Sequence, residues 1–182
     1  NVLTTTEHLV KLVAELLDLS RIESGKIRYE MIQNDLVPIV EEAAREFKEV
    51  ANRRGVNFSF QNMAGDTLQF IFDKDKDREI VINLIDNAIK YCKKEVLGRL
   101  ELTNNHICFS VKDDGIGMTE EDKKKLFIKF SRSEEALKTN VDGMGIGLYF
   151  VKKVIEDHKG RVGAESEGLG KGSVFFFELP LK

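Results

Sequence analysis

The sequence predicts an α+β fold: a two-layer sandwich in which helices pack on one mixed, mostly antiparallel sheet, preceded by a further helix at the N-terminus. Two observations lead to this prediction. Helical and strand periodicities alternate unevenly along the chain, and a turn signal joins two neighbouring strands into a hairpin. The chain has 182 residues, 42% of them hydrophobic, which suffices for one well-buried domain with a small appendage.

The first predicted helix spans residues 4–22 and begins at a capping box of Thr4 and Glu7. Its leucines and valines form two adjacent seams, an apolar face too wide for a helix that rests on one neighbour. We expect this helix to join a bundle with another chain or with sequence upstream; the alternative is docking on the chain's own core. The seams consist of Leu9, Leu12, Leu16 and Leu19, and of Val10, Val13 and Leu17.

A break near Ser24 and Gly25 separates this helix, in residues 1–24, from a second unit at 27–182. Residues 131–142 are polar and without periodicity, so we expect a loop there. In chain order, the other predicted elements are a strand at 27–32, a helix at 36–54 stopped by Gly55, alternating strands at 56–60 and 67–71, a helix at 77–93, hairpin strands at 99–103 and 107–112 that turn at Asn104-Asn105, a helix at 148–158, and strands at 162–165 and 173–179.

Composition and charge narrow the classes of partner. A formal net charge of −3 gives no indication that the chain binds a nucleic acid or an anionic membrane surface. Cys92 and Cys108 lack metal-ligand spacing, which suits small core residues in a reducing cytosol. No apolar run approaches the roughly 20 residues of a membrane span, so we expect a cytoplasmic chain. The chain opens at Asn1 without a methionine, which indicates a fragment, and any membrane anchor would lie upstream.

The stretch "DGMGIGLYF" places Gly143, Gly145 and Gly147 directly before a predicted helix. Glycines at a helix N-terminus expose backbone N–H groups that can hold an anion, so the stretch is either a phosphate cradle or a hinge. It is not the dinucleotide fingerprint, because its third glycine comes one residue early. The later "GLGKGS" is not a Walker A loop either, since Gly172 follows Lys171 where Ser or Thr is required.

The stretch "VKDDGIGM" places Asp113, Gly115 and Gly117 at the end of a predicted strand. Asp-Gly is a common turn dipeptide, so a plain turn is one interpretation. The other is a base pocket: the carboxylate accepts a hydrogen bond from an exocyclic amine, and the glycines let a flat ring approach the backbone. Such an acceptor favours adenine over guanine.

The stretch "INLIDNAIKY" places Asn83 and Asn87 four residues apart on one helix, with Lys90 and Tyr91 a turn later on nearly the same side. Asparagine is a poor helix former, which makes a plain solvated surface the weaker interpretation. Amide oxygens suit Mg²⁺, which shares its other positions with phosphates and waters. Lys90 can then reach a phosphate, and Tyr91 can stack on a base.

Together these motifs resemble a known family. The order "NLIDNAIKY", "DDGIGM", "LFIKFSR", "GMGIGL", "GKGS" is similar to the N, G1, F, G2 and G3 boxes of bacterial sensor histidine kinases. That family belongs to the superfamily of Bergerat-type ATP-binding folds, with DNA gyrase, a heat-shock chaperone and the MutL mismatch-repair protein. "LLDLSRIESGK" resembles the end of the family's second dimerisation and phosphotransfer helix. The resemblance covers essentially the whole chain.

The resemblance implies a role for each matching residue. Asn87 would be the Mg²⁺ ligand, and Asn83, Lys90 and Arg132 would act at the phosphates, with Arg132 reaching the γ-phosphate. The polar segment 131–142 would be a mobile lid that orders on nucleotide binding. In the nucleotide-binding set, Asn87 would hold the metal, Tyr91 and Asp113 would contact the base, and Gly115 and Gly117 would shape the base pocket. Phe127 and Phe130 would anchor the lid. The residues at the phosphates would be Gly143, Gly145, Gly147 and Leu148.

The family's acceptor histidine sits in a box upstream of this chain, and no such box is present here. His8 lies on the second-helix pattern, and His106 and His158 read as structural residues. We therefore expect a histidine protein kinase domain that binds ATP and Mg²⁺ but does not phosphorylate itself. The resemblance further implies a homodimer through the N-terminal helix and a response regulator as partner.

Two alternatives remain. One is a nucleotide-responsive protein-binding module without chemistry. The other is an ATPase of the gyrase or chaperone type, in which Glu79 would have to serve as general base. The sequence also departs from the family pattern once, at Asp114, where asparagine is more frequent.

Overall fold

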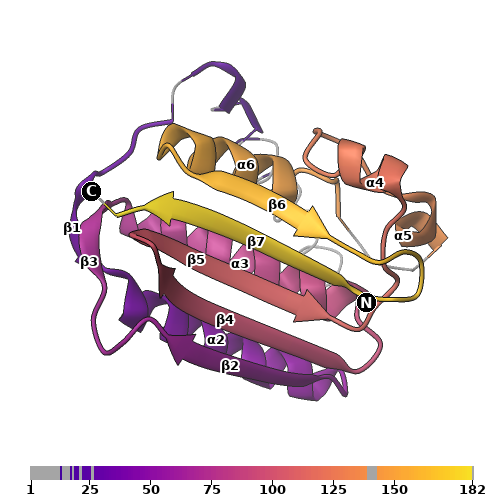
Figure 1. Ribbon diagram of the computed structural model, residues 1–182. Coiled ribbons are helices and arrows are strands. Elements are labelled where there is room, and N and C mark those ends of the chain that lie inside the picture. Colours follow the sequence, from indigo (N-terminus) through magenta and orange to yellow (C-terminus); the bar gives the residue numbers. More distant parts are fainter. Residues whose placement is uncertain are drawn as a thin grey trace.

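The computed structural model describes residues 13, 17, 19, 20, 22–25, 27–138 and 143–181. A layer of helices covers one face of a five-stranded sheet, as Figure 1 shows. The sheet runs in the order β2-β4-β5-β7-β6, with β2 parallel to β4 and the other neighbours antiparallel. The predicted two-layer α+β architecture with a mixed, mostly antiparallel sheet is confirmed. Its strands are β2 (Asn57–Met63), β4 (Glu95–Thr103), β5 (His106–Asp113), β6 (Arg161–Glu165) and β7 (Ser173–Pro180).

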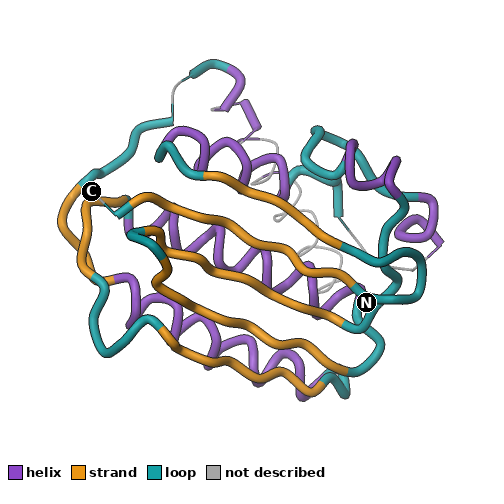
Figure 2. The backbone as a smooth tube through the Cα atoms, in the orientation of Figure 1, coloured by secondary structure: helices purple, strands orange, loops and turns teal. Residues whose placement is uncertain are grey.

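Three helices form the second layer, and the tube in Figure 2 separates them from the strands by colour. They are α2 (Leu36–Arg53), α3 (Lys74–Tyr91) and α6 (Gly147–Asp157). Asp35 caps α2 by accepting from the N–H of Val37, and Asp73 caps α3 by accepting from two N–H groups of the first turn. These side chains satisfy donors that a helix start leaves unpaired, which fixes where both helices begin.

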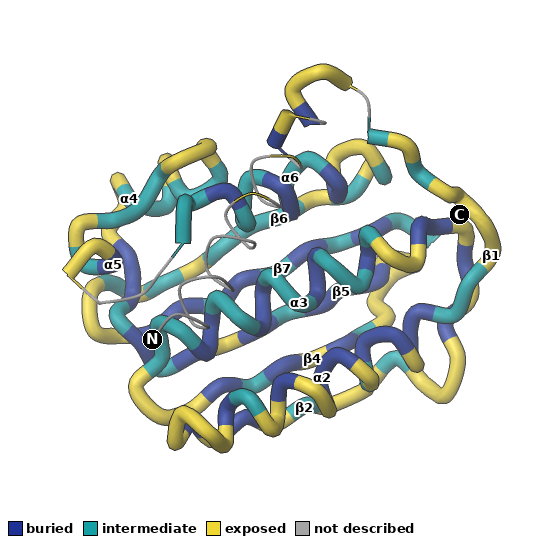
Figure 3. The backbone as a smooth tube through the Cα atoms, turned by 180° about the vertical axis from the view of Figure 1, so that it is seen from behind, coloured by how far each residue is buried: buried dark blue, intermediate teal, exposed yellow. Residues whose placement is uncertain are grey.

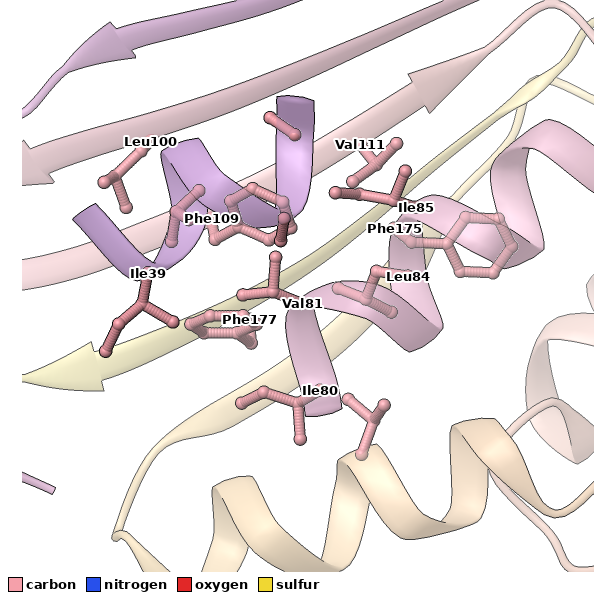
Figure 4. Close-up of a cluster of buried hydrophobic side chains, with 14 of the residues drawn as sticks. Ile39, Ile80, Val81, Leu84, Ile85, Leu100, Phe109, Val111, Phe175 and Phe177 are labelled. Carbon is pink, nitrogen blue, oxygen red and sulfur yellow. The ribbon is translucent and has the colours of Figure 1, made fainter. Parts of the chain in front are cut away.

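The core lies between the two layers. Figure 3 shows the buried positions of the helices on the sides that face the sheet. Along β5 the burial alternates, because Ile107, Phe109 and Val111 point to the helices while Lys112 is exposed on the other face. Side chains of α2, α3, β4, β5 and β7 meet in one cluster, drawn in Figure 4, that includes Ile39, Val81, Leu84, Leu100 and Phe177.

Most predicted elements are observed with shifts of a few residues at their ends. The predicted hairpin turn is confirmed: Asn104 and Asn105 both have positive φ (48° and 64°), as tight hairpin turns require. The predicted strand at 27–32 is wrong in its position, because the strand there is β1 (Ile32–Asp35), which pairs antiparallel with β3 (Gln69–Phe72). Before β1 the backbone bonds to a side chain instead: the Glu30 N–H donates to Asp73 at 2.8 Å.

Two short helices were not predicted. The first, α4 (Glu120–Lys125), begins at a capping box in which Thr119 and Asp122 exchange hydrogen bonds. The second, α5 (Glu134–Lys138), lies inside the polar segment expected as a loop. Residues 139–142 of that segment lie outside the described residues.

The described part of the N-terminal segment is helical at residues 13, 17, 19, 20, 22 and 23. Val13 and Leu17 are exposed, whereas Leu19 and Ile22 are buried, and Ile22 belongs to the core cluster. The end of this helix therefore docks on the chain's own core. The capping box and the seam residues Leu9, Val10, Leu12 and Leu16 lie outside the described residues. No described helix is long and apolar enough to cross a membrane.

Candidate functional site

A cavity of about 450 Å³ opens at the end of the sheet where β5 finishes. The second half of α3 forms one wall, the loop after β5 forms the floor, and the residues before α6 form the opposite rim. In Figure 1 this is the end of the sheet beside α4 and α5. The structure brings these sequence-predicted residues together as lining: Asn83, Asn87, Lys90, Tyr91, Asp113, Gly117, Arg132, Gly143, Gly145, Gly147 and Leu148.

Three predicted residues, all of them described, do not line the cavity: Gly115, Phe127 and Phe130. Gly115 instead donates its backbone N–H to the Asp113 carboxylate at 2.7 Å. Phe130 is 55% exposed, and it is held through its backbone, since its N–H donates to the carbonyl of Gly145 at 3.1 Å. Phe127 is half-buried. The exposed ring of Phe130 is not packed as an anchor here.

The α3 wall carries the amides and the cation. The Asn83 amide donates to the Glu79 carbonyl at 2.9 Å, which orients its side chain along the helix. A Cβ added at Gly147 would lie 2.5 Å from Asn83 Oδ1, which is closer than real Cβ contacts, so the Asn83 side chain would have to shift. Glycine at this position therefore lets the start of α6 approach the α3 wall. Two turns after Asn83, Lys90 Nζ lies 2.5 Å from Asp86 Oδ2.

Asp113 lies at the base of the cavity with 5% of its surface exposed. Burial raises the pKa of its carboxyl to about 6, although hydrogen bonds from the backbone of Gly115 and Ser173 lower it and the Asp114 charge raises it. At neutral pH the side chain is mostly ionised, so it is an acceptor at the base of the cavity. Apolar residues that also line the cavity are Ile116, Met118, Ile146 and Phe175.

Two glycine loops interlock beneath the cavity. Gly117 has a φ of +67°, and a Cβ there would lie 2.0 Å from the carbonyl oxygen of Gly168. The "GLGKGS" loop is further tied to the "DDGIGM" loop because the Gly170 N–H donates to the Ile116 carbonyl at 2.7 Å. Just before the "GLGKGS" loop, the Ser166 hydroxyl accepts from the Met118 N–H at 3.1 Å. The Gly117 position is glycine because the protein's own backbone packs against it.

Asp114 has a structural role. Its Oδ1 accepts from the N–H groups of Lys93, Lys94 and Glu95, at 2.9, 3.0 and 3.1 Å, where α3 gives way to β4. Burial raises the pKa of this carboxyl, but these backbone hydrogen bonds outweigh that effect and leave the pKa below its usual range. Three backbone N–H groups therefore stabilise the ionised Asp114 carboxylate, which holds the start of β4 against the loop after β5.

Arg132 bridges the two ends of the predicted lid. Its guanidinium donates to the carbonyl of Ala136 in α5 at 2.9 Å and, more weakly, to the carbonyl of Gly143 at 3.4 Å. Both carbonyls belong to the backbone on either side of residues 139–142. The side chain thus connects α5 to the glycine rim of the cavity.

Comparison with known proteins identifies the family. Residues 72–182 match the model of the histidine kinase-, DNA gyrase B- and HSP90-like ATPases, and this range contains every described residue that lines the cavity. The chain belongs to this family. It carries the ATP-binding catalytic domain of the sensor histidine kinases.

Three relatives illustrate the likeness. The circadian input-output histidine kinase CikA of Synechococcus elongatus is 30% identical over 96% of the chain and 23% of its own length. Full-length ShkA, solved in complex with AMPPNP, superposes with a TM-score of 0.82 at 26% identity, over 97% of the chain and 36% of its own. The catalytic domain of the histidine kinase ThkA gives a TM-score of 0.71 at 28% identity, over 83% of the chain and 95% of its own. The chain spans 11–30% of the length of the curated relatives it matches.

The motifs left some residues of this ATPase domain unassigned. Asp86, Lys125 and Ser173 line the cavity. Asp86 stands inside the asparagine motif, and Ser173 directly follows the "GKG" turn, so their positions were visible in the sequence. Lys125 carried no signal, because it lies on α4, which was not predicted.

The histidines of the domain are not in the cavity. His106 is exposed at the β4–β5 turn, and His158 is buried at the end of α6. His8 lies outside the described residues. The structural interpretation of His106 and His158 thus agrees with where they lie.

Proposed function

We propose that this chain binds Mg²⁺·ATP and forms the catalytic part of a histidine protein kinase, which transfers the γ-phosphoryl group to a histidine and onward to an aspartate of a response regulator. The observation that carries the proposal is the single cavity that unites the asparagine wall of α3, the buried acceptor Asp113 and the glycine rim before α6. ShkA, the relative with a TM-score of 0.82, was solved with an ATP analogue bound.

The proposed roles follow the chemistry of each wall. Asp113 accepts from the adenine amine, Tyr91 contacts the base, and Gly115 and Gly117 shape the recess around it. Gly143, Gly145, Gly147 and Leu148 surround the phosphates, next to Asn83 and Lys90 on α3. Arg132 reaches the γ-phosphate after it releases the lid carbonyls, and Phe127 and Phe130 flank that lid. This division assigns neutral and cationic groups to the triphosphate, and Asp113, the carboxylate at the base of the cavity, to the base.

The side chains present fit Mg²⁺ as the metal. Asn87 offers an amide oxygen at the cavity wall. Across the described residues, no three His, Cys, Asp or Glu side chains cluster as a metal cage. Mg²⁺ needs no such cage, because it keeps waters and phosphate oxygens as most of its ligands. When bound, Mg²⁺ would neutralise part of the triphosphate charge, and we assign Asn87 as its protein ligand.

We further propose that residues 1–24 are the C-terminal part of the second dimerisation helix, that residues 27–182 form the catalytic domain, and that the full-length protein is a homodimer. The exposed Val13 and Leu17 side chains offer apolar surface to such a bundle. The phosphate acceptor lies on a segment that this chain lacks. A cytoplasmic location, with any membrane anchor upstream, completes this proposal.

The alternative of a gyrase- or chaperone-type ATPase is weaker, because Glu79, its candidate general base, lies outside the cavity lining. Its carboxylate pairs with Lys76 at 2.9 Å, and it is absent from the described residues that line the cavity. A general base must reach the attacking water beside the γ-phosphate. The binding-module alternative requires the same nucleotide site and differs only in having no transfer step.

Calorimetric titration with ATP and with GTP, in Mg²⁺, tests the nucleotide assignment. We expect saturable ATP binding, no GTP binding, and at least a tenfold loss of ATP affinity in Asp113→Asn, because one charge-assisted hydrogen bond is worth about 1.5–3 kcal/mol. The matched control, Asp114→Asn, changes the neighbouring carboxylate and keeps ATP affinity. Equal binding of GTP and ATP contradicts the role of Asp113, and no binding of either contradicts the proposed function.

Incubation with γ-labelled ATP tests the missing acceptor. The chain by itself should remain unlabelled. Acid-labile label on this chain would show that one of its own histidines accepts the phosphoryl group.

A further inference from the structure

Asp86 occupies the centre of the α3 wall, and no motif assigns it a role. Asn83, Asp86, Asn87 and Lys90 follow the i, i+3, i+4, i+7 spacing of one helix face. All four line the cavity. A carboxylate thus stands between the two amides and the cation that we assign to the metal and the phosphates.

In this structure Asp86 holds Lys90. The 2.5 Å contact joins Asp86 Oδ2 to Lys90 Nζ, with the acidic residue four positions before the basic one, the more favourable order on a helix. The Lys90 side chain is 16% exposed and that of Asp86 is 24% exposed. Because both are largely buried, solvent screens this pair less than an exposed pair.

The cavity as a whole is acidic. Carboxylates outnumber cationic side chains among its described lining residues, so a bare triphosphate meets net repulsion there. If Lys90 turns to a phosphate, its ion pair with Asp86 breaks, and the Asp86 carboxylate then lies near that phosphate. The charged lining residues are Asp86, Asp113, Glu121, Asp122, Glu134 and Glu135 against Lys90, Lys125 and Arg132.

We propose that Asp86 is a positioning residue that makes ATP binding depend on Mg²⁺. While the cavity is empty, Asp86 keeps the Lys90 ammonium at the α3 wall. When Lys90 binds a phosphate instead, the Asp86 carboxylate accepts hydrogen bonds from water ligands of the metal beside Asn87, a role that suits Mg²⁺ because it retains several waters. This inference rests on the proposed function of the cavity.

The quantity that tests it is the ratio of the ATP dissociation constant in EDTA to that in Mg²⁺, measured by calorimetry. In Asp86→Asn the affinity in EDTA rises, because no carboxylate competes for Lys90, and the affinity in Mg²⁺ falls. We expect the ratio to drop by about tenfold, within the 5- to 150-fold range typical of coupled ligands. Asp86→Glu keeps the charge and should keep a ratio near that of the wild type.

Glu79→Gln is the matched control. It breaks an acid–lysine pair of the same helix, Lys76–Glu79, outside the cavity lining, and should leave the ratio unchanged. An Asp86→Asn variant that binds ATP more weakly by the same factor with and without Mg²⁺ overturns the inference, because Asp86 then only shapes the site. Wild-type protein that binds no ATP under either condition overturns the proposed function, and the inference with it.

Discussion

Replacing Asp77 by asparagine removes a proton-binding group from the interior of the helix layer. The Asp77 and His158 side chains are 1% and 4% exposed, and Asp77 Oδ1 lies 4.0 Å from His158 Nε2. Among the described residues, neither Asp77 oxygen has a hydrogen-bond partner. Burial, with a smaller contribution from the Asp73 charge, raises the pKa of Asp77 to about 8.

The histidine geometry supports a neutral aspartic acid. His158 Nδ1 lies 2.7 Å from the Val154 carbonyl, which can only accept, so Nδ1 carries a proton. In the neutral ring Nε2 is then an acceptor that faces Asp77. The ring of Tyr29 closes the pocket edge-on at 5.1 Å, and its hydroxyl donates to Asp157 at 2.8 Å. A protonated Asp77 is the donor that complements this arrangement.

The expected effect is a slope in stability against pH. The native protein keeps the Asp77 proton up to about pH 8, whereas the unfolded chain loses it near 3.8. The free energy of unfolding is therefore unaffected by this proton below pH 4, where both states keep it. It then falls as pH rises toward 8, because only the unfolded state has lost the proton. One proton corresponds to about 1.4 kcal/mol per pH unit, so between pH 5 and 7 the wild type loses roughly 3 kcal/mol relative to Asp77→Asn.

Urea unfolding followed by circular dichroism at pH 5, 6, 7 and 8 measures the difference. Asp75→Asn, on the exposed side of the same helical turn, is the matched control and should keep the wild-type slope. His158→Gln should also keep it, because the proton resides on Asp77. Parallel curves for the wild type and Asp77→Asn would refute the reasoning, and a slope that vanishes in His158→Gln would place the proton on the imidazole.

Two further predictions concern the cavity and the loop beside it. Gly147→Ala places a methyl group 2.5 Å from Asn83 Oδ1. ATP affinity, measured by calorimetry, should fall by about tenfold or more, while the free energy of unfolding changes by less than about 1 kcal/mol. Unchanged ATP affinity would mean that the Asn83 side chain moves aside without affecting nucleotide binding. Asp114→Ala removes the acceptor of three backbone N–H groups, a loss comparable to that of a helix cap. The free energy of unfolding in urea should fall by about 1–2 kcal/mol, with little change in ATP affinity. A large loss of ATP affinity without a loss of stability would contradict the structural role of Asp114.

Local sequence patterns predicted many of the helices and turns of this protein. The apolar period predicted the helix at 148–158, and α6 is observed at Gly147–Asp157. The Asn104-Asn105 turn was predictable because both residues tolerate positive φ. The Asn83–Asn87 spacing alone puts both amides on one wall, whereas the sequence brought the motifs together in one nucleotide site only through their resemblance to the boxes of the family.

The sequence by itself therefore determined the fold class, the order of the main helices and strands, and the residue types around the cavity, because the patterns that mark them involve residues close in the chain. The position of β1 and the short helices α4 and α5 did not follow from these patterns. Tertiary structure decided which partner each residue meets. Gly117 is glycine because of Gly168, 51 residues further along the chain, and Asp77 is buried against His158 at the C-cap of α6. Periodicity shows that a side chain is buried, but its pKa, its hydrogen bonds and its steric limits depend on the distant segment that covers it.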